Sequence, residues 1–90
     1  MEYKATKSFW EDYKNLPPEL KEKAKKNFEL FKQNQRHPSL QTHHIKGTSN
    51  PKVYEGYLDK GYRFTFHYEE GSVVFRRIGS HGIIDEEARS

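Results

Sequence analysis

The chain has 90 residues, of which 32% are hydrophobic, 14% aromatic and 32% charged, and its formal net charge is +3 at pH 7. This length suits a single domain, residues 1–90, with a small core built largely from aromatic rings. The absence of cysteine excludes disulfides, thiolate metal sites and a cysteine nucleophile. No apolar leader and no run of membrane-spanning length is present, so we expect a cytoplasmic protein with no membrane partner.

The first half of the sequence predicts a short strand and two helices. Residues 3–6 suit the strand. Thr6 or Ser8 can cap the helix that follows, and its apolar residues fall at helical spacing at Phe9, Tyr13 and Leu16. Pro17 ends this helix, and Pro18 suits the first turn of a second one. The apolar stripe of the second helix contains Leu20, Ala24, Phe28 and Phe31.

From residue 40 the hydrophobic period changes to two, which is typical of strands. Strands are predicted at residues 40–46, 53–58, 62–68 and 72–78, separated by turns that each contain a glycine. In the third of these, alternation places Tyr62, Phe64, Phe66 and Tyr68 on one face, and it places Arg63, Thr65 and His67 on the other. Residues 83–90 form a short acidic tail that is expected to be frayed rather than packed.

These elements predict an α+β domain in which two N-terminal helices pack on one face of a four- to five-stranded, mainly antiparallel sheet. The opposite face is expected to be polar and open, and it is where function is sought. Residues 1–46 hold ten Lys/Arg against six Asp/Glu, or +4, whereas residues 47–90 hold six against seven, or −1. This distribution favours a polyanion or an acidic protein as partner.

Histidine and arginine side chains are expected to meet on that open face. Arg63 lies in the third strand, His81 follows the last one, and His43 and His44 lie in the first strand after the helices. Imidazoles exchange protons near neutral pH, and guanidinium groups bind phosphate oxygens in pairs. The combination indicates phosphodiester chemistry on RNA without a metal. No helical His-x-x-x-His pair or carboxylate partner accompanies the histidines, so no metal site and no cofactor are predicted.

The chain resembles the RelE/ParE toxin superfamily of bacterial toxin–antitoxin systems along nearly its whole length. The resemblance rests on the two-helix N-terminal half and on five short stretches in matching order: residues 37–40, 45–47, Tyr54 with Leu58, 61–64 and 77–81. It implies a toxin that cleaves mRNA in the ribosomal A site, with mRNA, the ribosome and a cognate antitoxin as partners. ParE-like members share the fold but poison DNA gyrase, and a degenerate member that only binds antitoxin is a third reading.

By position, the resemblance places Arg63 against the scissile phosphate. It makes His81 a catalytic residue, here the general acid, and His43 resembles a catalytic histidine of the YafQ-like members. The base is then His43 or Glu55, and the roles of acid and base can be reversed. Lys46 and Arg77 are expected to bind flanking phosphates, Tyr57 to stack on a base, and His44 to be a further RNA contact.

Two departures from the family pattern accompany this resemblance. Glu55 and Tyr57 stand where RelE itself carries a pair of lysines. The aromatic residue that usually follows the last strand's histidine or arginine is absent, because residues 82–85 read Gly-Ile-Ile-Asp. The expectation that separates an enzyme from a gyrase-binding toxin is that His43, Arg63 and His81 converge.

Overall fold

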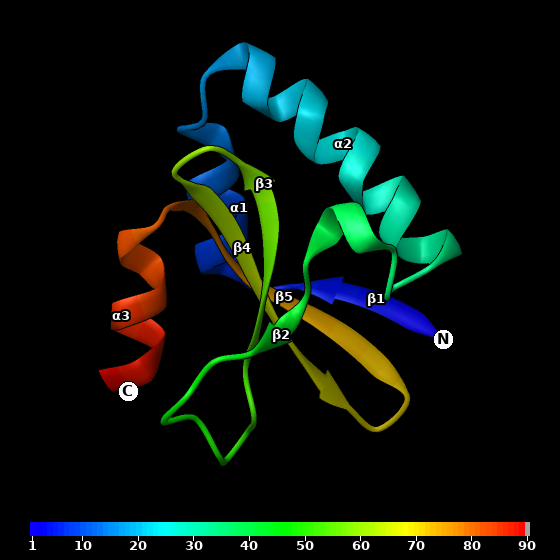
Figure 1. Cartoon of the computed structure of the whole chain (residues 1–90), viewed down its shortest axis with the longest axis vertical. Helices are drawn as coiled ribbons and strands as arrows, with labels where there is room; N and C mark the ends of the chain where they lie inside the picture. The colour runs from blue at the N-terminus through cyan, green and yellow to red at the C-terminus, as the bar shows by residue number, and fades with distance from the viewer. Residues whose placement is uncertain (90) are drawn as a thin grey trace.

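A computed structural model describes residues 1–89, which form one five-stranded mixed sheet with helices on both of its faces (Figure 1). The helical elements are α1 (Lys7–Lys14), α2 (Pro18–Gln33), the 3₁₀ turn η1 (Pro38–Leu40) and α3 (Gly82–Arg89). The strands are β1 (Glu2–Ala5), β2 (His43–His44), β3 (Tyr54–Asp59), β4 (Tyr62–Glu69) and β5 (Ser72–Ser80). Their order is β1-β5-β4-β3-β2, with only β1 and β5 parallel. The predicted α+β class and mainly antiparallel sheet are confirmed.

Thr6 connects β1 to α1 and caps the helix. Its hydroxyl accepts a hydrogen bond from the Phe9 amide at 3.1 Å and donates one to the Arg76 carbonyl of β5 at 2.9 Å. A side-chain cap of this kind stabilises a helix by about 1 kcal/mol. Pro18 occupies the first turn of α2, where its missing N–H costs nothing. The two predicted helices are therefore confirmed, and the cap is Thr6.

The face of the sheet that α1 and α2 cover is an aromatic core. Strand alternation directs Phe64 and Phe66 of β4 to this face, together with Phe75 of β5. From α2, the Phe28 ring centroid lies 4.9 Å from that of Phe75, and the Phe31 centroid lies 5.0 Å from that of Phe66. Large rings compensate for the small number of apolar residues, because each buries more area than an aliphatic side chain.

Gly56 of β3 lets this core approach the backbone of the strand that carries the site. The Phe64 ring lies where a Cβ at residue 56 would be, and Gly56 is the register partner of Phe64. A side chain at this position would therefore displace the ring. The close contact fixes β3 against β4, and with it the outward-facing residues on either side of Gly56.

Helix α3 corrects the expectation of an unpacked acidic tail and an open outer face. It lies on the side of the sheet opposite the aromatic core, and it buries Ile83 and Glu87 against β4 and β5 (Figure 1). Thr65 and His67, expected on an exposed surface, are buried. Ile83 and Glu87 are four residues apart and so share one helix face. Ser90, the last residue of the predicted tail, lies outside the described residues.

The segment predicted as a strand over residues 40–46 is mostly irregular. Pro38 starts the turn η1, Leu40 enters the core, and Gln41 follows with a left-handed φ of 47°. Left-handed backbone ends regular structure for a non-glycine residue. Only His43 and His44 therefore pair with β3 as β2.

Candidate active site

Three polar side chains from adjacent strands meet on the outer face of the sheet. His43 of β2 pairs in register with Glu55 of β3, and on the same face Arg63 of β4 pairs with Tyr57. His43 Nε2 lies 3.2 Å from Glu55 Oε2, and Arg63 Nε lies 3.8 Å from Glu55 Oε1. Only 8% of Glu55 is exposed. One buried carboxylate thus stands between an imidazole and a guanidinium group, and it brings His43 and Arg63, two of the three residues expected to converge, to one place.

Arg63 is held in place from three directions. One terminal nitrogen, Nη1, donates to the carbonyl of Asp59 at 3.0 Å and to that of Tyr62 at 2.8 Å. The guanidinium carbon lies 4.8 Å from the centroid of the Tyr57 ring. Within the described residues, Nη2 has no hydrogen-bond partner, so its two N–H groups are available to an anion. A fixed cation with free donors suits a phosphate.

Both ring nitrogens of His43 face oxygen acceptors. Nδ1 lies 3.1 Å from the Gln41 carbonyl, and Nε2 faces Glu55. Neither carbonyl nor carboxylate oxygen can donate, so His43 satisfies both contacts fully only by donating from both nitrogens. The side chain is nevertheless 63% exposed, which leaves the edge and faces of the ring accessible.

His81 lies at the same end of the sheet as Arg63. Arg63 pairs in register with Gly79, and the His81 amide, two residues on, donates to the Gly61 carbonyl at 2.8 Å. His81 is exposed and directly precedes α3, whose Ile84 amide donates back to the His81 carbonyl at 3.1 Å. The turn that starts α3 therefore also sets the position of this histidine.

Two further predicted site residues, His44 and Arg77, make their contacts outside the cluster of His43, Glu55 and Arg63. His44 shares the parity of Tyr54, and its Nε2 lies 2.8 Å from the Thr48 carbonyl, so its ring fastens the loop between β2 and β3. Arg77 does not join the cluster. Its guanidinium pairs with Asp12 of α1 at 2.6 Å and with Glu86 of α3 at 2.9 Å, and the hydrogen bonds that it donates to the Asp12 carboxylate raise the Arg77 pKa above its usual value.

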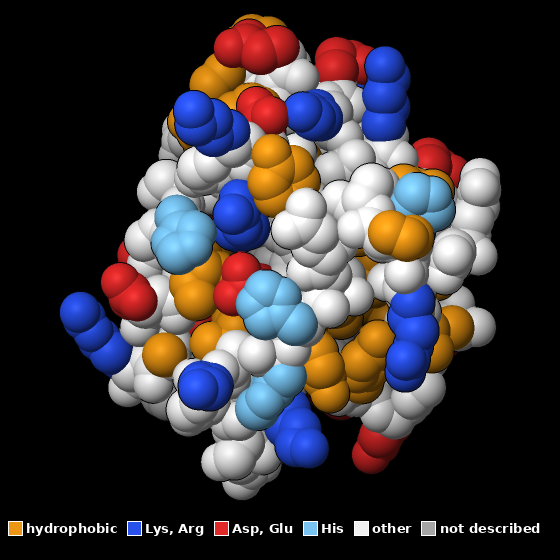
Figure 2. Space-filling view, viewed as in Figure 1, with side chains coloured by type: hydrophobic (Ala, Val, Ile, Leu, Met, Phe, Trp, Pro, Cys, Tyr) orange, Lys and Arg blue, Asp and Glu red, His pale blue; other side chains and the backbone are white. Residues whose placement is uncertain are grey.

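An open pocket of about 390 Å³ adjoins the cluster between β2, β3 and α3. His43 and Glu55 line one side of it. The other lining residues are His44, Ile45, Lys46, Ile84, Asp85 and Ala88. Figure 2 shows histidine, acidic and basic side chains gathered on this face of the molecule, over β2, β3 and β4.

Helix α3 contributes to the site in a way that the sequence pattern does not predict. Ile84, Asp85 and Ala88 belong to the segment expected to be an acidic tail, yet they form one side of the pocket. The i, i+4 spacing of Ile83 and Glu87 is compatible with one face of a helix. Amphipathic patterning, however, predicts apolar residues on a buried helix face, and Glu87 carries a carboxylate. The helix is recognisable only when the partners of Glu87 in β4 and β5 are known.

Among residues 1–89, no group of three or more His, Asp or Glu side chains is arranged to hold a metal ion. Within the same part of the chain, no helix has the length and apolarity needed to cross a membrane.

Matches to known proteins are found by comparing structures, not by comparing sequences. No family model matches the sequence, and no curated protein matches it. The "RelB-RelE antitoxin-toxin complex from Methanococcus jannaschii" contains a similar chain, with a TM-score of 0.71, 24% identity, and coverage of 92% of this chain and 95% of that one. The chain has the RelE-like toxin fold.

Two further solved structures share this RelE-like fold. The E. coli DinJ–YafQ toxin–antitoxin complex gives a TM-score of 0.74 at 15% identity, covering 91% of this chain and 93% of that one. The YoeB/ParE toxin from Agrobacterium tumefaciens gives 0.72 at 17%, covering 90% and 99%. The fold predicted from the resemblance is therefore confirmed.

Proposed function

We propose that this chain is the toxin of a toxin–antitoxin system, and that it is a ribosome-associated, metal-independent endoribonuclease that cleaves mRNA. The observation that carries the proposal is the convergence of His43, Glu55 and Arg63 on one sheet face, with His81 at the same end of the sheet. The RelE-like fold supports the toxin class, since its structural neighbours include RelE, YafQ and YoeB/ParE toxins. A purely gyrase-binding protein needs no such convergence.

In the proposed reaction, the 2′-hydroxyl attacks the adjacent phosphorus and the bond to the 5′-oxygen breaks. Glu55 is the base that removes the 2′-hydroxyl proton, because both nitrogens of His43 already face oxygen acceptors. His43 orients the Glu55 carboxylate through the 3.2 Å contact. The products are a 2′,3′-cyclic phosphate and a free 5′-hydroxyl.

Arg63 and His81 complete the proposed mechanism. The free N–H groups of Arg63 Nη2 stabilise the negative charge that develops on the phosphorane oxygens. His81 then gives a proton to the departing 5′-oxygen, a role that suits an exposed imidazole near neutral pH. The proton that Glu55 gains is returned to solvent, and His81 is reprotonated from solvent. Both side chains are thereby restored for the next reaction, and no metal or cofactor takes part.

The test is cleavage of a defined mRNA on programmed ribosomes. Arg63→Ala should slow cleavage by about 10²–10³-fold, the loss typical of a charge-stabilising donor. His81→Ala should slow it by about 10²–10⁴-fold, the range for a general acid. Arg36→Ala is the matched control, because Arg36 is exposed and lies outside the cluster. Full cleavage by both variants would refute the mechanism, while growth arrest with intact mRNA and damaged DNA would favour gyrase as the target.

The proposed partners are mRNA, the ribosome and a cognate antitoxin. Antitoxins are bound in several of the structures with this fold, RelB in some and DinJ in others. The net charge of +4 over residues 1–46 suits an acidic protein as well as RNA.

A further inference from the structure

The pocket between β2, β3 and α3 has a chemistry that the proposed cleavage reaction does not use. His43 and Glu55 form the side that it shares with the candidate active site. The pocket therefore borders the place where the proposed reaction would hold the scissile phosphate. The volume of about 390 Å³ is in the range of small-ligand sites.

The pocket offers apolar surface for the face of a planar ring. Ile45, the residue after β2, contributes to the lining, as do Ile84 and Ala88, which lie four residues apart on one side of α3. Extruded bases are commonly held between apolar or aromatic side chains and read along their Watson–Crick edge. The lining therefore suits a base whose edge is left to polar groups.

Two charged side chains in the pocket have no partner among the residues that the structure describes. Lys46 and Asp85 both line it, both are exposed, and neither forms a hydrogen bond or ion pair within residues 1–89. In contrast, Glu55 is held by His43, and His44 is held by Thr48. The pocket thus presents one free ammonium donor and one free carboxylate with two acceptor oxygens.

This pair of groups complements one base better than the other three. The guanine edge offers O6 as an acceptor beside two donors, N1–H and N2–H, so a carboxylate can accept both while an ammonium donates to O6. Adenine, cytosine and uracil each carry only one donor on that edge. We propose that this pocket binds a guanine base of the mRNA, with Asp85 and Lys46 as the specificity-determining residues; the assignment of mRNA as the ligand rests on the proposed function.

Binding can be measured without cleavage. The four nucleoside monophosphates are titrated into the full chain, and amide shifts are followed by NMR. Guanosine monophosphate should bind about tenfold or more tightly than the other three, as expected for one bidentate pair. Asp85→Asn should remove this preference, because an amide offers only one acceptor oxygen. Glu11→Gln, the same change of charge at an exposed residue of α1, should keep it.

Asp85→Asn also removes the favourable interaction of a carboxylate with the N-terminal end of α3. The melting temperature of the variant is therefore measured together with its nucleotide affinity. Lys46 lies outside any helix, so Lys46→Gln provides a second variant without an effect on helix stability. It should lower guanosine monophosphate affinity more than Lys7→Gln, a matched change on α1. Equal affinity of the wild-type chain for all four nucleotides, or an unchanged guanine preference in both pocket variants, would overturn the proposal.

Cleavage mapping separates this proposal from the proposed function. Programmed ribosomes carry messages that differ only by guanine or adenine beside the scissile bond. The wild-type chain should cut the guanine message faster, and Asp85→Asn should bring the two rates together. Cleavage with no guanine preference would refute the pocket assignment and leave the nuclease standing. Selective guanosine monophosphate binding without any cleavage would support the pocket assignment and refute the nuclease.

Discussion

Glu55 places one carboxylate between the imidazole of His43 and the guanidinium of Arg63. A carboxylate in a largely buried position is stable only when cations or donors compensate for lost solvation. Here the compensation comes from His43 and Arg63, the same two side chains that the proposed cleavage reaction uses. The arrangement therefore serves folding and the proposed chemistry at once.

Glu55→Gln is expected to keep the shape of this residue and remove its ability to accept a proton. If Glu55 is the base, single-turnover cleavage on programmed ribosomes should fall by about 10²–10⁴-fold. Glu11→Gln changes the net charge equally at an exposed position of α1 and should cleave like wild type. A Glu55→Gln rate close to that of wild type would show that another group is the base.

At the scale of single residues, alternation along a strand predicted the position of Arg63 but not that of Arg77. The pattern in β4 correctly placed Arg63 opposite the aromatic core. The same logic does not extend along β5, because a register shift occurs where Thr65 pairs with Arg77 but Phe66 pairs with Phe75. Arg76 is the extra residue, and Arg77 extends to Asp12 and Glu86 instead of the cluster. A bulge is set by the pairing of two strands, so one strand's pattern does not reveal it.

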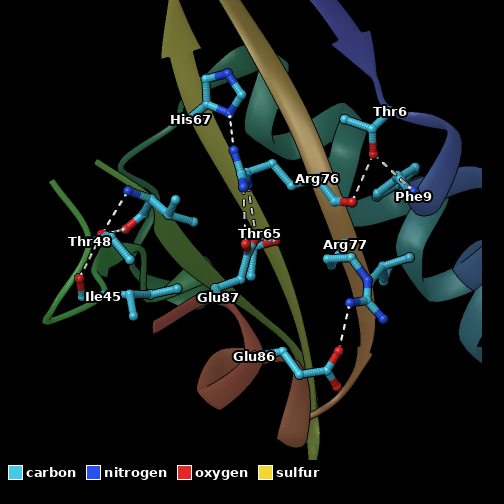
Figure 3. A network of polar contacts seen from close by, with 12 residues as sticks. Thr6, Phe9, Ile45, Thr48, Thr65, His67, Arg76, Arg77, Glu86 and Glu87 are labelled. Carbon is cyan, nitrogen blue, oxygen red and sulfur yellow. Dashed lines mark hydrogen bonds and ion pairs between the residues drawn. The ribbon is translucent and has the colours of Figure 1, made fainter. Parts of the chain in front are cut away.

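At the scale of elements, α3 is fastened to the sheet by a buried polar network (Figure 3). Glu87 accepts hydrogen bonds from Thr65 at 2.7 Å and from Arg76 at 3.0 and 3.2 Å. Arg76 also lies 3.0 Å from His67 Nδ1, which extends the network along β4. The helix that borders the pocket is thus held by hydrogen bonds and charge as well as by Ile83.

Glu87→Ala should destabilise the fold strongly, whereas Glu86→Ala should not. The side chain of Glu87 is 7% exposed and pairs with Arg76, so its removal leaves a partly buried cation unpaired and should cost about 3 kcal/mol or more. Glu86 is 60% exposed, and its pair with Arg77 is worth less than about 1 kcal/mol after solvent screening. Urea unfolding of the two variants measures the difference. Equal midpoints would mean that the Glu87 network does not fasten α3.

For the molecule as a whole, element order and hydrophobic period were enough to predict the sheet and the helical layer on its inner face, but not the helix on its outer face. The change from helical to strand spacing near residue 40 separated the two helices from the antiparallel strands, and the aromatic alternation in β4 identified the inner face. The third helix was not predictable in this way, because it is stabilised by contacts between Glu87 and strands far from it in sequence. Periodicity reports local amphipathicity and carries no information about such distant partners.

The charge distribution of the whole molecule predicts how ribosome binding should depend on salt. Each phosphate that a lysine neutralises releases counterions, so affinity falls with salt concentration, with a slope of about 0.7–0.9 per contact. Lys25 and Lys26 are exposed on α2, outside the candidate site. If α2 faces ribosomal RNA, Lys25→Gln with Lys26→Gln should reduce the slope by roughly 1.5, the sum for two contacts.

Ribosome sedimentation at several salt concentrations measures this slope. Arg63→Ala provides the contrasting variant, because it removes a cation from the opposite face of the sheet and should slow cleavage by about 10²–10³-fold while leaving the contribution of α2 to binding intact. An unchanged slope in the double lysine variant would show that α2 points away from the ribosome, with the orienting contacts on another face of the molecule.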